Sequence, residues 1–259
     1  MSKFMFDVEA WEPEETETEI EVSSMPAPEE LLKNYEYFFY AYSGGRDSTL
    51  TLFKTAPLLK QEGKTVEALY VDTAVEFPDL LPFIMRTCET LDVPLKILKP
   101  KRNFFEVYGE KKCFPDSIFR DCIDTLINSP CDAYCSSFES PYVLIRGGRR
   151  KQKTARSKSN EVQKIKSKPL LTIWNPIFNL SVEEYDREIE SVPIWPGYAK
   201  GFERTACWCC PFQKTSQWEA LKENLPLCWE ELSIMMQEWK FTEHKGDSYL
   251  KNIKKYWNL

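Results

Sequence analysis

Residues 39–50 read FYAYSGGRDSTL, an apolar strand that runs into a glycine pair and then into the start of a helix. Gly44 and Gly45 can adopt backbone angles that other residues avoid, so successive amide groups can point at one anion. The helix that begins at Asp47 and Ser48 adds unpaired amides and a dipole that favours negative charge. The stretch predicts a phosphate-binding loop, in which Asp47 holds Mg²⁺ or orients the loop. The alternative is a strand, turn and helix that bind nothing, as in many α/β proteins.

Apolar runs and helical periodicity alternate along the chain. We predict strands near 36–43, 66–71, 95–99, 141–146 and 171–174, and helices near 47–62, 79–91, 103–110, 216–224 and 229–240. The alternation predicts an α/β fold, a parallel sheet with helices on both faces. Ligands of such sheets bind beyond the carboxyl ends of the strands, where the loop 43–48, Asp72 and Arg146 are expected to converge.

Charge and composition divide the chain into three predicted segments, 1–30, 31–180 and 181–259. The first is an acidic, flexible arm: ten acids and no Lys or Arg lie between Asp7 and Glu30, so residues 7–30 carry −10 and the rest of the chain +4 of the net −6. The second is a nucleotide-binding domain, and the third is a small helical part that bears a cysteine cluster. No signal-peptide core and no apolar run of about 20 residues is present, which predicts a cytoplasmic protein without membrane contact.

The chain also contains a basic segment, whose charge is opposite to that of the acidic arm. Arg146 to Lys168 holds ten basic residues and one acid, Glu161. Guanidinium groups suit phosphate because their planar forks donate two parallel hydrogen bonds. The segment is therefore predicted to bind an anion, the alternative being a solvated basic loop, and the arm is expected to shield it partly from polyanions.

Nine cysteines in a cytoplasmic protein favour metal or redox chemistry over disulfides. Cys207 and Cys210 have the spacing of one corner of a metal or cluster site. Two ligands do not complete a site, and the candidates for completion are Cys122, Cys228 and the pair Cys131 and Cys135. The alternative is that several are buried apolar residues.

Four blocks together resemble the phosphoadenylylsulfate (PAPS) reductase family of the PP-loop superfamily. They are the Ser-Gly-Gly-x-Asp-Ser loop, the block YVDTAVEFP at 70–78, the block IRGGRRKQKTAR at 145–156, and the elements WNPI at 174–177 and GFERTACWCCPF at 201–212. The resemblance implies a Rossmann-like domain that binds an adenine nucleotide, ATP or PAPS/APS. The implied contacts are Ser43, Gly44, Gly45, Asp47, Ser48, Asp72, Thr73, Arg146, Gly147, Arg149, Arg150, Gln152 and Arg156. Ala74 replaces the usual glycine, so the turn after Thr73 is expected to differ.

Relatives that carry clusters place a cysteine about eight residues before a proline ahead of the arginine block. Cys122 and Pro130 match that spacing, although Ile127 stands where a lysine is usual. The favoured ligand set for a [4Fe-4S] cluster is therefore Cys122, Cys207, Cys210 and Cys228. Zinc is the alternative, because four thiolates suit it equally.

The leading functional hypothesis is ATP-dependent activation in sulfur transfer, which releases AMP and pyrophosphate. Asp47, Arg149 and Arg150 are the predicted catalytic residues, and Arg156 joins the two arginines in stabilising pyrophosphate. The predicted partners are an adenine nucleotide, a nucleic-acid acceptor reached through the basic segment, and a sulfur-donor or electron-donor protein.

Two alternatives stay open. One is a PAPS or adenylylsulfate reductase, although the residues after Cys228 contain no cysteine to attack sulfur. An exposed thiol such as Cys209 or Cys135 would have to replace it. The other is a regulatory subunit that binds a nucleotide or cluster without turnover.

Overall fold

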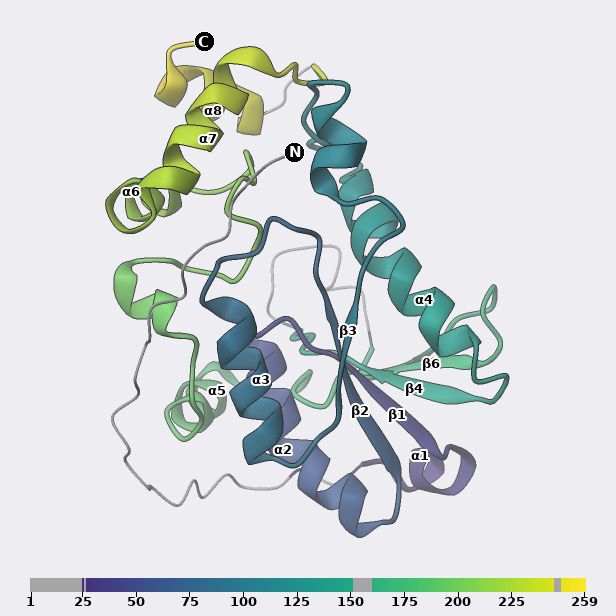
Figure 1. The fold of residues 1–259 in the computed structure, drawn as a ribbon. Helices are drawn as coiled ribbons and strands as arrows, with labels where there is room; N and C mark the ends of the chain where they lie inside the picture. Colours follow the sequence, from purple (N-terminus) through teal and green to yellow (C-terminus); the bar gives the residue numbers. More distant parts are fainter. Residues whose placement is uncertain (1–24, 26, 151–159, 245–247) are drawn as a thin grey trace.

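A computed structural model describes residues 25, 27–150, 160–244 and 248–259. Its centre is a six-stranded sheet in the order β3-β2-β1-β4-β6-β5 (Figure 1). The strands are β1 (Tyr37–Ala41), β2 (Thr65–Val71), β3 (Leu95–Leu98), β4 (Tyr142–Ile145), β5 (Val162–Lys164) and β6 (Leu171–Trp174). All neighbouring pairs are parallel except β5 and β6, which are antiparallel. The predicted α/β class is confirmed, and so are all five predicted strands, whereas β5 was not predicted.

Alternate residues of the strands face opposite sides of the sheet, and both sides are buried. Phe38 and Tyr40 lie in one core with residues of α2 (Arg46–Gln61) and α3 (Leu80–Thr90). Phe39 lies in a second core against α4 (Ser129–Ser136) on the other side. Helices therefore cover both faces, as predicted.

The remaining helices lie at the ends and flanks of the sheet. Short α1 (Glu29–Asn34) begins before the predicted border at residue 30, and α5 (Val182–Ile189) packs on the outer side of α2. The C-terminal helices α6 (Thr215–Asn224), α7 (Pro226–Glu238) and α8 (Ser248–Trp257) gather together in Figure 1.

Turns of other helical types complete the fold: η1 (Phe105–Gly109) and η2 (Ile123–Asn128) are π-helical, and η4 (Pro196–Lys200) is a 3₁₀ helix. The prediction for 103–110 thus found the segment but not its type. No described helix has the length and apolarity needed to cross a bilayer.

Candidate functional site

The predicted phosphate loop joins the end of β1 to α2. Gly44 adopts φ +67°, and a Cβ there would lie 2.7 Å from Leu80 Cδ1, so both the angle and the space require glycine. Gly45 precedes the first residue of α2, and the Ser48 hydroxyl donates a 2.9 Å hydrogen bond to its carbonyl. The first amides of α2 thus lie at the carboxyl end of the central strand, the arrangement that binds phosphate groups in other proteins.

The loop after β4 packs directly on this helix start. A Cβ on Gly147 would lie 2.7 Å from the Asp47 carbonyl carbon and 2.8 Å from the Ser48 nitrogen. Beyond it, Arg149 Nε lies 3.2 Å from Asp47 Oδ1, and this ion pair is about three-quarters buried. Gly147 and Arg149 of the arginine block therefore lie against the phosphate loop, whereas the residue of this block predicted to reach it was Arg146.

Other residues of the block lie elsewhere. Arg146 is exposed at the end of β4. Burial raises the pKa of Cys131 of α4 to about 11, and the positive charge of Arg146 opposes that rise. The Arg150 guanidinium is exposed and donates a 2.7 Å hydrogen bond to Asn179. Gln152 and Arg156 lie outside the described residues.

Two tyrosines that sequence reasoning missed also reach the phosphate loop. The Tyr185 hydroxyl donates a 2.7 Å hydrogen bond to Asp47 Oδ1, and the Tyr198 hydroxyl accepts one of 3.2 Å from the Arg46 amide. Each tyrosine ring also carries a guanidinium: Arg149 lies 3.7 Å from the Tyr185 ring centroid, and Arg46 4.1 Å from that of Tyr198. No local pattern could reveal these pairs, which are 138 and 152 residues apart in the chain.

The phosphate loop forms one side of the site, and the turn after β2 forms another. Thr73 is buried, and Glu76 accepts hydrogen bonds from its amide and its hydroxyl. Burial raises the pKa of Glu76 above its ordinary 4.5. Asp72 accepts from the Ala74 amide and pairs with Lys99 at 3.4 Å. Ala74 has φ +73°, in the left-handed region that favours glycine, the residue usual at this position.

The cysteine turn, residues 205–210, lies against both the phosphate loop and the turn after β2. The Trp208 amide donates a 2.9 Å hydrogen bond to the Val75 carbonyl, and a Cβ on Gly45 would lie 3.2 Å from Thr205 Oγ1. Cys210 follows in a turn closed by a hydrogen bond from its amide to the Cys207 carbonyl. The backbone of the cysteine turn therefore lies next to the phosphate loop and the turn after β2.

Three of the four predicted ligands interact. A hydrogen bond with Cys209, together with burial, raises the pKa of the Cys207 thiol well above 9.0. Burial and the nearby Cys210 raise the pKa of Cys122 to about 12. Cys228 lies buried on α7, where burial and Glu231 raise its pKa to about 11. Within the described ranges, no three His, Cys, Asp or Glu side chains are arranged as ligands of one metal ion.

The two thiols suggested as replacements in a reductase are not exposed. Cys209 is 0% and Cys135 is 2% exposed, and both belong to the cores of the fold. That expectation was wrong, because Cys135 faces the sheet from α4 and Cys209 points inward from the cysteine turn.

A parallel sheet with a glycine-bearing phosphate loop beyond its central strand defines a nucleotide-binding α/β protein of the PP-loop class. The family model of the phosphoadenosine phosphosulfate reductase domain matches residues 37–213. The chain belongs to this family.

Several known proteins are similar to the chain. An uncharacterized protein of Methanocaldococcus jannaschii is 28% identical over 210 residues, which cover 76% of this chain and 47% of that protein. The chain thus spans about half the length of this relative. PAPS reductase from Candida auris has a TM-score of 0.51 at 15% identity, over 70% of this chain and 85% of that one. Candida glabrata FMN adenylyltransferase, solved with FAD and inorganic pyrophosphate, has a TM-score of 0.50 at 15% identity, over 67% and 57%. At such identity the structural likeness shows the fold alone.

Proposed function

We propose that the protein is an ATP-dependent activating enzyme of sulfur transfer, which forms AMP and pyrophosphate. The observation that carries this proposal is the contact of the cysteine turn with both the phosphate loop and the turn after β2. Thr205 borders Gly45, and Trp208 is hydrogen-bonded to Val75. A site that activates an acceptor with ATP and then delivers sulfur needs its phosphate loop and its thiols within one reaction space.

In the proposed reaction the triphosphate lies on the amides at the start of α2. An oxygen of the acceptor attacks the α-phosphorus, the bond to the β-phosphate breaks, and pyrophosphate leaves with its charge stabilised by Arg149. Sulfur from a donor then attacks the activated carbon, and AMP leaves with the oxygen. Mg²⁺ suits Asp47, because this ion is bound by one or two carboxylates together with phosphate oxygens.

ATP–pyrophosphate exchange tests the proposal. The wild type should catalyse exchange in the presence of an RNA or other acceptor preparation, and Asp47→Asn should reduce it strongly. Asp92→Asn is the matched control, because Asp92 is exposed and pairs with Lys60 instead. Exchange that is absent from the wild type, or unchanged in Asp47→Asn, contradicts the proposal.

The second candidate is a sulfonucleotide reductase, which the family match favours. It predicts release of sulfite from PAPS or adenylylsulfate with thioredoxin as electron donor, and no exchange with ATP. Nucleotide binding with neither product favours the third candidate, a regulatory subunit.

A [4Fe-4S] cluster, or Zn²⁺, held by Cys122, Cys207, Cys210 and Cys228 is a separate proposal, and the interactions of Cys122 and Cys207 with Cys210 support the first three of these ligands. Anaerobic absorbance with iron, zinc and sulfide assays tests it, since a thiolate-held cluster is expected to absorb near roughly 400 nm. Cys122→Ser should lower metal content, whereas the control Cys88→Ser, a buried position of α3, should not. Protein without metal when isolated anaerobically contradicts it.

The proposed acceptor is a nucleic acid. Arg146 is exposed at the end of β4, and Lys164 of the basic segment pairs with Glu30 of the acidic arm at 3.1 Å. Deletion of residues 1–30 should strengthen binding to RNA at low salt, where phosphate contacts dominate the affinity. Unchanged affinity refutes the shielding role of the arm.

A further inference from the structure

Helix α5 reaches the phosphate loop through one side chain. Tyr185 is 7% exposed, its hydroxyl donates to Asp47 Oδ1 at 2.7 Å, and its ring carries the Arg149 guanidinium at 3.7 Å. Both Asp47 and Arg149 belong to the proposed nucleotide site. A single tyrosine thus holds the carboxylate and supports the arginine that pairs with it.

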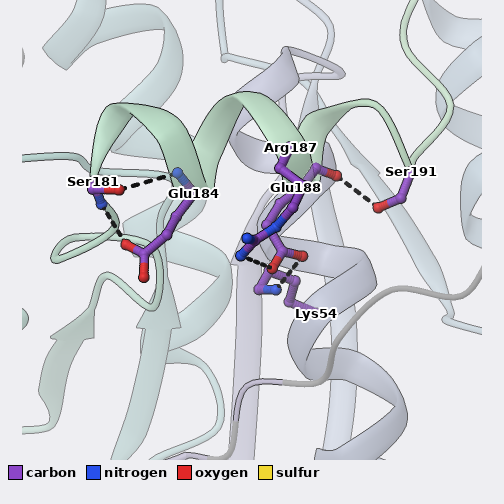
Figure 2. Close-up of polar contacts among 6 residues, drawn as sticks. All are labelled: Lys54, Ser181, Glu184, Arg187, Glu188 and Ser191. Atoms are coloured by element: carbon purple, nitrogen blue, oxygen red, sulfur yellow. Dashed lines mark hydrogen bonds and ion pairs between the residues drawn. The ribbon is translucent and has the colours of Figure 1, made fainter.

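The surroundings of α5 restrict how far Tyr185 can move. The helix begins with a capping box, in which Ser181 and Glu184 each accept a hydrogen bond from the other's backbone (Figure 2). Further along, Glu188 forms a 2.7 Å ion pair with Lys54 of α2, and the two side chains are 11% and 2% exposed (Figure 2). Because a buried pair of this kind tolerates little separation, α5 is fixed to the same helix whose first turn holds Asp47.

Apolar packing also fixes α5 to α2. Tyr185 and Val192 lie in one buried cluster with Leu50 and Phe53 of α2. The tyrosine therefore approaches Asp47 from a surface that packing, capping and charge all hold in place.

We propose that Tyr185 is a positioning residue, which orients the Asp47 carboxylate for Mg²⁺ bound with ATP. The inference rests on the proposed function and adds to it a residue from outside the motifs of the family. Mg²⁺ requires near-ideal octahedral geometry, so a carboxylate that can rotate binds it less well than one that is held. The hydrogen bond to Oδ1 supplies that restraint, and the ring keeps Arg149 beside it.

Calorimetric titration of the full chain with ATP, once with Mg²⁺ and once with EDTA, tests this role. Tyr185→Phe keeps the ring and removes only the hydroxyl. We expect it to weaken Mg-ATP binding about tenfold, the effect of losing one hydrogen bond to a charged group, and to leave ATP binding in EDTA unchanged. Tyr256→Phe is the control, because its hydroxyl bonds to Glu219 among the C-terminal helices.

The outcomes separate this inference from the proposed function. Wild-type protein that binds Mg-ATP, with Tyr185→Phe binding it equally well, overturns the positioning role alone. Equal weakening with and without Mg²⁺ also overturns it, because a merely structural tyrosine would act that way. Wild-type protein that binds no Mg-ATP overturns the proposed function and the inference together.

Discussion

Replacing Gly147 with alanine tests the contact between the arginine loop and the phosphate loop. The added Cβ would lie 2.7 Å from the Asp47 carbonyl carbon, 2.8 Å from the Asp47 oxygen and 2.8 Å from the Ser48 nitrogen. All three atoms belong to the backbone of the first turn of α2, so no side chain can rotate away. The closest contact is about 0.7 Å short of the 3.4 Å at which ordinary contact begins.

The size of the effect follows from that overlap. Overpacking of a close contact costs about 1–3 kcal/mol, which corresponds to a fall in melting temperature of roughly 2–12 °C. The two loops must separate, and displacement of Arg149 from Asp47 by a sizeable part of 1 Å should slow exchange by up to about 100-fold.

Thermal unfolding and ATP–pyrophosphate exchange of Gly147→Ala measure these two effects, and ATP titration shows whether the site still binds. Gly109→Ala is the matched control, because its Cβ would meet atoms no closer than 3.7 Å. A Gly147→Ala protein that melts and binds ATP as the wild type and the control do would refute the described packing of the two loops.

Three further predictions concern stability. Ala74→Gly should stabilise the protein by about 0.5–1 kcal/mol in denaturant unfolding, because the left-handed cost of φ +73° exceeds the entropy that glycine adds to the unfolded chain; a destabilised variant would contradict this. Lys54→Met should cost about 3–5 kcal/mol, because it removes the buried cation 2.7 Å from Glu188 and leaves the more distant Arg187 at 3.9 Å, and Lys54→Met/Glu188→Leu should recover most of that loss; a double variant no better than the single one would contradict it. Burial raises the pKa of Glu76, so the unfolded chain ionises first and this residue's contribution to stability falls as pH rises from 4.5 through the raised pKa. Urea unfolding across that window should show a steeper fall for the wild type than for Glu76→Gln, and parallel curves would refute it.

Long periodic patterns predicted most of the fold. The helices α2, α3, α6 and α7 were predicted from their helical periodicity, and the five strands from short apolar runs, which β4 and β6 show as four consecutive buried residues. The missed β5 has three residues, and α1 has six. By contrast α5 carried a readable signal: Ser181 followed three residues later by Glu184 is the pattern of a capping box.

The residues of the candidate site also fall into those that the sequence could predict and those that it could not. Gly44, Gly45 and Asp47 were predicted from the local pattern and Cys207 and Cys210 from their spacing, whereas the family resemblance added Arg149 and Cys122. Tyr185 and Tyr198 gave no signal, because a lone tyrosine in a charged helix or beside a glycine has many ordinary explanations. The positions of Arg150 and Cys228 were equally beyond sequence reasoning, since both depend on where a loop or helix turns after it leaves the sheet.

The dependence of the phosphate loop on Tyr185 and Tyr198 has a consequence for the order of events on the ribosome. The strands β1, β2, β4 and β6 can all pair once the chain has been synthesised as far as Trp174. Asp47 gains its partner Tyr185 only when the chain 138 positions further on has emerged and packed. Arg46 must wait for Tyr198, which lies 152 positions beyond it. A nascent chain should therefore build its scaffold well before it can retain a nucleotide, because the phosphate loop gains its last tyrosine partner only after Tyr198 has emerged.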